Sequence, residues 1–239
     1  RLFVTNAVSG TTLTCIPGTL NYRNAKIQIL DVPGIIEGAA GGRGRGKEVL
    51  GMARNANLVL FVVDAMHPEH LPLLKKEVGD VGIRLGRRKP DVKIVRKPKG
   101  GISVHSTVNL TKVSEETLIA ILRDFKWVNA DVVIREDIDI DQFIDAIEAN
   151  RSYVQGLVCI SKADLLDAAG RKNIQDQIPG CVFVSAEKKH GIEHLKETIF
   201  DQLSFARVYL KEINKKPDMD VPMILTKPAT LKSVCEHIH

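Results

Sequence analysis

Asp31-Val32-Pro33-Gly34 is the first segment whose residue types and spacing could perform chemistry. It directly follows the alternating apolar and polar run 26–32, a pattern typical of a half-buried strand. A carboxylate in this position can hold Mg²⁺ through a water molecule. The N–H of Gly34 can meet a terminal phosphate, because glycine lets the phosphate approach the backbone closely. An ordinary turn at the end of a strand is the alternative interpretation.

Lys162-Ala163-Asp164 follows a second apolar strand, 156–160. The stem of Lys162 can pack on the face of a purine. The Asp164 carboxylate can accept two hydrogen bonds, from N1–H and from the exocyclic amine of guanine. Adenine lacks this pair of donors, so Asp164 would select guanine and argues against an ATP-using protein.

Ser185-Ala186, followed by Glu187, comes after a third apolar run, 181–184. A backbone N–H here can meet guanine O6. Open α/β sheets bind their ligands at the carboxyl ends of the strands. Each of these three motifs is weak alone, but their order along the chain predicts a guanine nucleotide site.

These motifs need a sheet whose strands end at one edge. Short apolar strands alternate with amphipathic helices, which indicates βαβ units, a mostly parallel sheet and helices on both faces. The expected fold class is therefore α/β. The strands are predicted at 1–4, 26–32, 57–65, 156–160 and 181–184, and the helices at 47–55, 68–85 and 191–203.

The stretch from 88 to 150 interrupts this alternation and predicts a small α+β insertion. It contains expected strands within 102–113 and at 131–134, a helix capped by Ser114, and a second helix that begins at the pair Asp139 and Gln142. Two further strands are expected around 208–210 and 223–225, and a helix is expected from 229. The expected organisation is 1–87 and 151–204 for the main domain, 88–150 for the insertion and 205–239 for a C-terminal module.

The positive charge is concentrated in one window. Residues 84–99 carry a net charge of +7, which leaves −2 for the remainder of a chain whose net charge is +5. Clustered Lys and Arg release counterions from nucleic acid, so this window predicts a phosphate-contacting surface, and a solvated loop is the alternative. The candidate RNA contacts are Arg84, Arg87, Arg88, Lys89, Lys93, Arg96, Lys97 and Lys99.

Composition excludes several classes of protein. Apolar residues make up 44% and charged residues 26% of the chain, values that exclude disordered and collagen-like chains. There is no run of about 18 apolar residues, so no membrane-spanning helix is expected. Arg1–Val4 shows no export signal, and the four cysteines lack metal-ligand and CxxC spacing. We therefore expect a cytoplasmic protein with reduced thiols.

Longer segments resemble the Obg-type GTPases, specifically the developmentally regulated GTP-binding protein (DRG) branch. The resemblance covers nearly the whole chain and is most specific between Leu30 and Gly46. It rests on Thr11–Gly18, Ile29–Ala40, Gly42–Gly46, Val81–Leu85, Asn129–Asp131 and Ile134–Asp137. Tyr209-Leu210 with Lys216-Pro217-Asp218 resembles the start of a TGS domain, a small β-grasp module. The resemblance implies a P-loop GTPase-type sheet, an α+β insertion and a partial TGS domain at the C-terminus.

The resemblance also implies roles by position. Thr12, beside Thr11, would be the Mg²⁺ ligand of the first switch, and Asp31 to Gly34 would form the second. Ile35 stands where related GTPases place a water-orienting glutamine, so hydrolysis should be slow and need a potassium ion or a protein partner as activator. Lys162 and Asp164 would read guanine. Ser161 replaces the family's asparagine and, being shorter, should tether the phosphate loop less well.

The phosphate-binding motif GxxxxGK[ST] is absent from the 239 residues. Either the phosphate loop is missing from these 239 residues or the protein has lost its phosphate site. In the first case, we expect the missing residues between Val4 and Thr5 or between Ser9 and Gly10, with 5–9 as the end of the helix that follows the loop. Without a phosphate site the other nucleotide motifs would serve no purpose, so we favour a GTP- and GDP-binding, GTP-hydrolysing switch that acts with ribosomes or RNA and a regulatory partner. The alternative is a catalytically inactive scaffold with the same fold that binds RNA or a protein.

Overall fold

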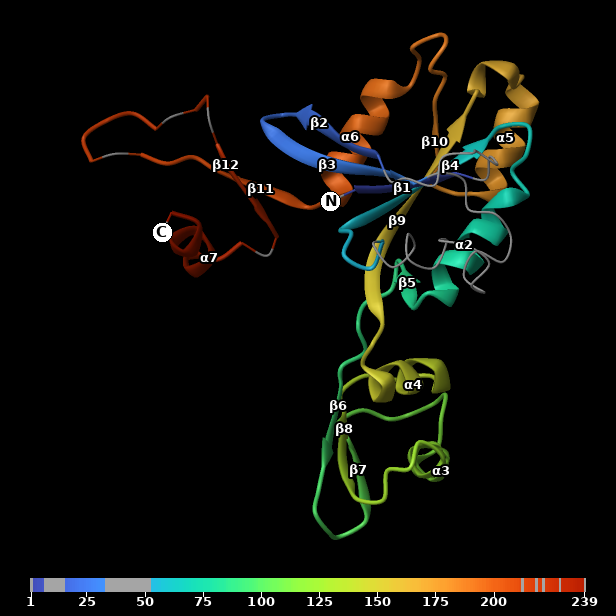
Figure 1. Ribbon diagram of the computed structural model, residues 1–239, viewed down its shortest axis with the longest axis vertical. Coiled ribbons are helices and arrows are strands. Elements are labelled where there is room, and N and C mark those ends of the chain that lie inside the picture. Colours follow the sequence, from blue (N-terminus) through green and yellow to red (C-terminus); the bar gives the residue numbers. More distant parts are fainter. Residues whose placement is uncertain are drawn as a thin grey trace. The chain divides into compact units, whose positions relative to one another are not determined.

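The computed structural model describes residues 2–6, 16–32, 53–211, 213–217, 219–220, 222–227 and 229–238 (Figure 1). The chain forms two compact units. The main unit comprises Arg1–Leu85 and Val154–His239, and the inserted unit comprises Gly86–Tyr153. Each unit has a hydrophobic core of its own.

A mixed sheet forms the centre of the main unit. Its strands are β1 (Leu2–Asn6), β2 (Ile16–Tyr22), β3 (Ala25–Val32), β4 (Leu58–Asp64), β5 (Ile83–Leu85), β9 (Ser152–Ser161) and β10 (Val182–Phe183). Among the described residues the order is β10-β9-β4-β1-β3-β2, with β5 paired to β9. From β10 to β3 each neighbouring pair is parallel, and β2 is antiparallel to β3. The predicted α/β class with a mostly parallel sheet is confirmed.

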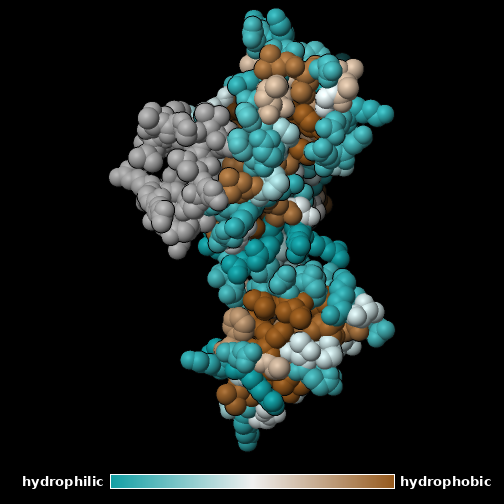
Figure 2. All heavy atoms as spheres, turned by 90° about the vertical axis from the view of Figure 1, so that its right-hand side faces the viewer, coloured by the Kyte–Doolittle hydropathy of each residue, from teal (hydrophilic) through white to brown (hydrophobic). Residues whose placement is uncertain are grey.

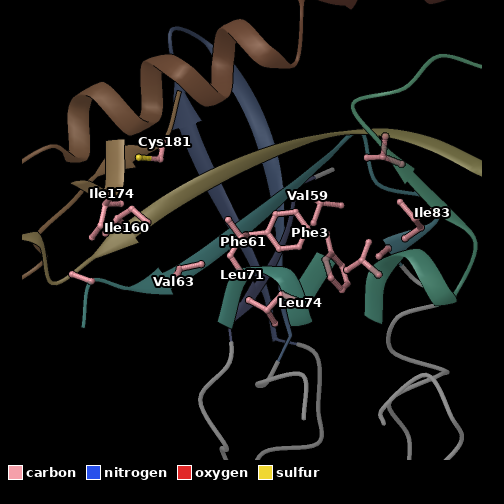
Figure 3. Close-up of a cluster of buried hydrophobic side chains, with 14 residues drawn as sticks. Phe3, Val59, Phe61, Val63, Leu71, Leu74, Ile83, Ile160, Ile174 and Cys181 are labelled. Atoms are coloured by element: carbon pink, nitrogen blue, oxygen red, sulfur yellow. The ribbon is translucent and has the colours of Figure 1, made fainter. Parts of the chain in front are cut away.

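Helices cover both faces of this sheet. They are α2 (His70–Asp80), α5 (Ala168–Gln177) and α6 (Ile192–Gln202), with a short 3-10 turn, η1 (Ala163–Leu165). Leu71 and Leu74 of α2 pack on Phe3 and Phe61, which point to the same face from β1 and β4 (Figure 3). On the opposite face, α6 contributes Phe200 and its neighbours to a second cluster. Burial on both faces explains why β4 is a continuous apolar run.

The inserted unit is a three-stranded sheet with two helices. Its elements are β6 (Val92–Arg96), β7 (Ile102–Ser106), α3 (Glu115–Asp124), β8 (Ala130–Ile134) and α4 (Ile140–Glu148). The order is β6-β8-β7, with β8 antiparallel to β6 and parallel to β7. Leu118, Leu122 and Phe143 of the helices pack with Val132 and Ile134 of β8. The face of this unit seen in Figure 2 also carries exposed hydrophobic side chains in one patch.

Both predicted helix caps in the inserted unit are confirmed. The hydroxyl of Ser114 accepts a hydrogen bond from the N–H of Thr117 at 3.3 Å. Asp139 and Gln142 form a reciprocal capping box: the Asp139 carboxylate accepts from the Gln142 N–H at 2.8 Å, and the Gln142 side chain accepts from the Asp139 N–H at 2.9 Å. These bonds satisfy N–H groups that have no partner within the helix, so the sequence alone fixes both helix starts.

Other predicted boundaries are wrong. Thr5 is buried within β1, so it is not the end of a helix. Pro68 lies before α2 and not at its first position, and the helix ends at Asp80 because Gly82 turns the chain with a positive φ. Ser9, Gly10 and most of the helix expected at 47–55 lie outside the described residues.

The C-terminal residues form a hairpin and a helix. The strand expected at 223–225 is present as β12 (Met223–Thr226) and pairs antiparallel with β11 (Phe205–Val208). The strand expected at 208–210 is wrong in its bounds, because β11 ends at Val208. The helix α7 (Leu231–Ile238) begins after Thr230, whose hydroxyl accepts from the N–H of Ser233 at 3.2 Å. In the described part of the chain, no helix has the length and apolar character needed to cross a membrane.

The core of the inserted unit generates a stability prediction. Phe143→Ala should lower the unfolding free energy of this unit by about 3–5 kcal/mol, because the fully buried ring leaves a cavity. Ile140→Ala, on the same helix but 43% exposed, should cost less than about 0.5 kcal/mol. Urea unfolding followed by the fluorescence of Trp127, the single tryptophan of the chain, reports on this unit. Equal losses in both variants would contradict this packing.

Candidate nucleotide-binding site

The carboxyl ends of the parallel strands meet at one edge of the main sheet. Strand β1 lies between β3 and β4. The strands β2 and β3, which follow it in the chain, lie on one side of β1, and the later strands β4, β9 and β10 lie on the other side. Ligands of open α/β sheets bind outside the strand ends at such a reversal of strand order. The described residues at this edge are those at the ends of β1, β3, β4, β9 and β10.

Strand β9 ends at Ser161, opposite Asp64 at the end of β4. The Ser161 hydroxyl donates to the carbonyl oxygen of Val63 at 3.1 Å, so it ties the two strands together. Lys162 follows in the left-handed conformation, with φ of 54°, which turns the chain out of the strand. A non-glycine residue in this conformation is uncommon and often marks a functional site.

Lys162 pairs with a carboxylate that the sequence analysis did not single out. Its Nζ lies 2.7 Å from Oδ2 of Asp64, and Oδ1 of Asp64 accepts from the N–H of Met66 at 2.9 Å. The ammonium of Lys162, followed by the N–H of Met66, holds the pKa of Asp64 below its usual range. Asp64 is therefore charged at neutral pH and fixes the direction in which the Lys162 stem extends.

Asp164 lies in the η1 turn and is half-buried. The turn is held against β10 because the N–H of Ala163 donates to the carbonyl of Val184 at 3.1 Å. A hydrogen bond from the Ser185 hydroxyl, and then its own backbone N–H, hold the pKa of Asp164 below its usual range. The structure thus brings Asp164 and Ser185 together, as a charged carboxylate that can accept further hydrogen bonds.

The loop after β10 is closed by its own backbone. Ser185 and His190 exchange N–H···O bonds of 3.0 Å, and the Ser185 hydroxyl accepts from the N–H of Lys188 at 3.1 Å. The N–H of Ser185 is therefore occupied, which leaves that of Ala186 for a base oxygen. Ala186 and Glu187 are both exposed in the turn.

Two supporting residues escaped the sequence analysis. Arg171 on α5 donates from Nη2 to the Ala163 carbonyl at 2.9 Å, so it braces the turn that carries Asp164. Gly191 has a φ of 76°, and a Cβ there would collide with the carbonyl oxygen of Phe183. A glycine directly before an amphipathic helix is a signal that could have identified Gly191. Arg171 carries no such signal, because its role depends on the packing of α5 beside η1.

Of the Asp31–Gly34 motif, the structure describes only Asp31 and Val32. Asp31 is exposed near the end of β3 and stands opposite Val4 of β1 and Ile16 of β2, while the backbone of Val32 pairs with that of Thr5. Thr11, Thr12, Pro33 and Gly34 lie outside the described residues. Strands β1 and β4 separate the ends of β3 and β9. A ligand in contact with both ends would lie across three strand spacings, about 14 Å.

The basic window is divided between the two units. Arg84 lies on β5 of the main unit, and the other seven residues lie in the inserted unit. Arg88 pairs with Glu136 at 2.9 Å, Lys97 pairs with Asp131 at 2.6 Å, and the Arg96 guanidinium lies 4.3 Å from the centre of the Trp127 ring. The window is therefore not one continuous basic surface, since partners already engage part of its charge.

Comparisons with known proteins agree with this geometry. Residues 2–97 match the family model described as "50S ribosome-binding GTPase", and residues 99–205 match "C-terminal region of MMR_HSR1 domain". The chain is 49% identical over 237 residues to an uncharacterized GTP-binding protein of Methanocaldococcus jannaschii, covering 98% of this chain and 61% of that protein. It is 42% identical over 235 residues to developmentally-regulated GTP-binding protein 2 of Homo sapiens, covering 96% of this chain and 63% of that protein.

The chain thus spans about three fifths of the length of these curated relatives. Among solved structures, Era of Aquifex aeolicus bound to GDP and AlF4⁻ aligns with a TM-score of 0.41 at 17% identity, covering 95% of this chain and 61% of that one, which is too loose to transfer residue roles. The sequence relatives decide the assignment. By its homology over nearly all of its length, the chain belongs to the developmentally regulated GTP-binding protein branch of the GTPase family.

Proposed function

We propose that the chain carries the guanine-recognition half of a GTP-binding and GTP-hydrolysing switch that acts with ribosomes or RNA. The observation that carries the proposal is the cluster of Lys162, Asp164 and Ser185 at the carboxyl ends of β9 and β10, with Asp164 charged and half-buried. A carboxylate that accepts from both N1–H and the exocyclic amine distinguishes guanine from adenine. Adenine does not offer this pair of donors, so the carboxylate would be left without hydrogen-bond partners.

Each member of the cluster has a separate task in this proposal. The Lys162 stem, directed by Asp64, covers one face of the purine. Asp164 accepts from the Watson–Crick edge of guanine, and the N–H of Ala186 donates to O6. Arg171 and Gly191 contact no ligand: they hold the η1 turn and the loop after β10 in place.

Mg²⁺ fits the phosphate side of the proposed site. Asp31 offers an exposed carboxylate at the carboxyl edge, and oxygen ligands with retained waters are what Mg²⁺ prefers. Asp31 through water, and Thr12 directly, would hold the ion. When bound, the ion neutralises the charge that develops between the β- and γ-phosphates. In the sequence, Ile35 stands where related GTPases place a water-orienting glutamine, so hydrolysis would be slow and need a potassium ion or a partner protein.

Substitution of Asp164 tests guanine recognition. Asp164→Asn should weaken GTP binding by roughly 1.5–3 kcal/mol, because an amide oxygen replaces a charged acceptor of two donors. Xanthosine triphosphate should bind relatively better, since its C2 oxygen can accept from the new amide. Competition with a fluorescent GDP measures both affinities.

Asp176→Asn is the matched control, because Asp176 is an exposed aspartate on the neighbouring helix α5. It should leave both affinities unchanged. Guanine affinity that is the same in the Asp164 and Asp176 variants would remove Asp164 from the site.

A specific observation favours a second candidate function, a catalytically inactive scaffold with the same fold that binds RNA or a protein. Only nine residues, 7–15, connect β1 to β2, and they contain no GxxxxGK[ST] motif. In a phosphate-binding loop this motif supplies the N–H groups and the lysine that hold the β- and γ-phosphates. A scaffold would keep the base-recognition cluster and lack this contribution.

Affinities for GMP, GDP and GTP separate the two candidates. A switch must contact the terminal phosphates, so GTP should bind the 239-residue chain at least about tenfold more tightly than GMP, since one charge-assisted hydrogen bond adds roughly 1.5–3 kcal/mol. A scaffold binds all three equally. Isothermal titration with each nucleotide in Mg²⁺ gives the comparison, and equal affinities would overturn the switch for this chain.

The inserted unit supplies the proposed contact with RNA. Arg87, Lys89, Lys93 and Lys99 are exposed, and the described residues show no ion pair for any of them. Lys93 lies on the sheet face opposite α3 and α4, because its neighbours Val92 and Ile94 pack into the core. The family description as ribosome-binding supports a ribosomal target. Residues 205–239 would contribute as part of a TGS domain, in a cytoplasmic protein.

Salt dependence tests this contact. Each phosphate contact adds about 0.7–0.9 to the log–log salt slope, so replacing Arg87, Lys89 and Lys93 with Ala should flatten the slope of ribosomal large-subunit binding by roughly two to three units. The matched control replaces Lys75, Lys76 and Lys172, three exposed lysines of the main unit, with Ala. Equal slopes for the two triple variants would show that the exposed basic residues are only solvated.

A further inference from the structure

A group of potential metal ligands lies outside the nucleotide site, between β4 and α2. His67, Glu69 and His70 each offer one ligand atom, and the three atoms lie within 4.8 Å of one another. Nδ1 of His67 is 2.9 Å from Oε1 of Glu69. The two imidazole rings stack, with centroids 5.3 Å apart and planes inclined by 24°.

The backbone that carries these side chains is held on both sides. The N–H of His67 donates to the Asp64 carbonyl at 2.9 Å, and the N–H of His70 donates to the His67 carbonyl at 3.3 Å. Pro68 fixes the φ angle between the two histidines. A ligand that binds here therefore orders side chains only, because the backbone is already in place.

The carboxylate of Glu69 is held by its own backbone N–H and by His67, which together keep its pKa below the usual range. Glu69 occupies the N-cap position of α2, yet its side chain makes no capping hydrogen bond. Instead it turns back to His67. Glu69 and both imidazoles thus face one point, and the side chains of His67 and Glu69 are 58% and 64% exposed, so solvent and ions reach them.

We propose that His67, Glu69 and His70 bind a transition-metal ion such as Zn²⁺. Two imidazoles and a carboxylate are a ligand set that suits Zn²⁺, Co²⁺ or Ni²⁺, whereas Mg²⁺ and Ca²⁺ take oxygen ligands. In tetrahedral geometry with bonds of about 2.0–2.1 Å, donor atoms stand about 3.3 Å apart, so small side-chain rotations close the group around an ion. On binding, the ion displaces the hydrogen of the bond between His67 and Glu69, which is released to solvent, and a fourth position stays open to water.

The site is chemically distinct from the Mg²⁺ site proposed at Asp31, because two of its three ligands are imidazoles. It lies three residues beyond Asp64, on the turn whose carboxylate holds Lys162. A bound ion would stabilise this turn and the start of α2.

Cobalt titration of the untagged, metal-free 239-residue chain tests the proposal. We expect one Co²⁺ per chain, visible d–d absorption typical of tetrahedral nitrogen and oxygen ligation, and displacement by one equivalent of Zn²⁺. The combined change His67→Ala and His70→Ala should weaken Co²⁺ binding by roughly 100-fold or more, because even outer-shell changes cost about 10–100-fold. Glu69→Gln keeps the size of the side chain and should weaken binding by roughly tenfold.

Matched controls separate this site from the other histidines and from the thiols. His105→Ala changes an exposed histidine of the inserted unit, and Cys235→Ser removes the exposed thiol of α7. Both should keep full Co²⁺ affinity, and circular dichroism should show that every variant is folded. Absence of Co²⁺ binding by the parent chain, thiolate-to-cobalt absorption, loss of binding in Cys235→Ser, or unchanged binding in the double histidine variant would each overturn the proposal.

Discussion

The parallel pairing of β4 with β9 is the constraint on which the site depends. Its register sets Asp64 opposite Ser161, so Lys162 emerges beside the carboxylate that pairs with its ammonium. The pairing of β9 with β10 then brings the η1 turn to the loop after β10, where the Ser185 hydroxyl meets Asp164. A slip of one residue would exchange the two faces of β9 and put its side chains into the wrong core, so packing on both faces enforces the polar geometry.

The two units differ in what they offer to the proposed ligands. The main unit holds its turns with backbone hydrogen bonds and with Arg171, so the proposed guanine-recognition cluster is braced by the chain itself. Preorganised groups lose less entropy on binding. The inserted unit buries its own core and leaves polar side chains on the outer face of its sheet, where Asp131 and Glu136 neutralise part of the basic window. The net charge of a sequence window therefore does not give the charge that the folded protein exposes there.

The errors in the sequence-based predictions have physical causes. Strand β2 was missed because Pro17 and Gly18 are poor strand formers, and its long antiparallel pairing with β3 overrides that preference. Strand β6 was hidden among lysines and arginines, since only one of its faces is buried. Thr5 was assigned to a helix, but pairing on both sides, with Val32 and Phe61, holds it in β1.

The sequence by itself determined the α/β class and both helix caps of the inserted unit, and it predicted the guanine-recognition residues, because these depend on local patterns: alternation, hydrogen bonds within one turn and motifs at strand ends. Tertiary structure alone decided that Asp64 holds Lys162 and that Arg171 braces the Asp164 turn. These contacts join residues on different elements, and only the packing of helices on the sheet sets their distances. His67, Glu69 and His70 are close in sequence, yet only the folded turn directs their side chains to one point.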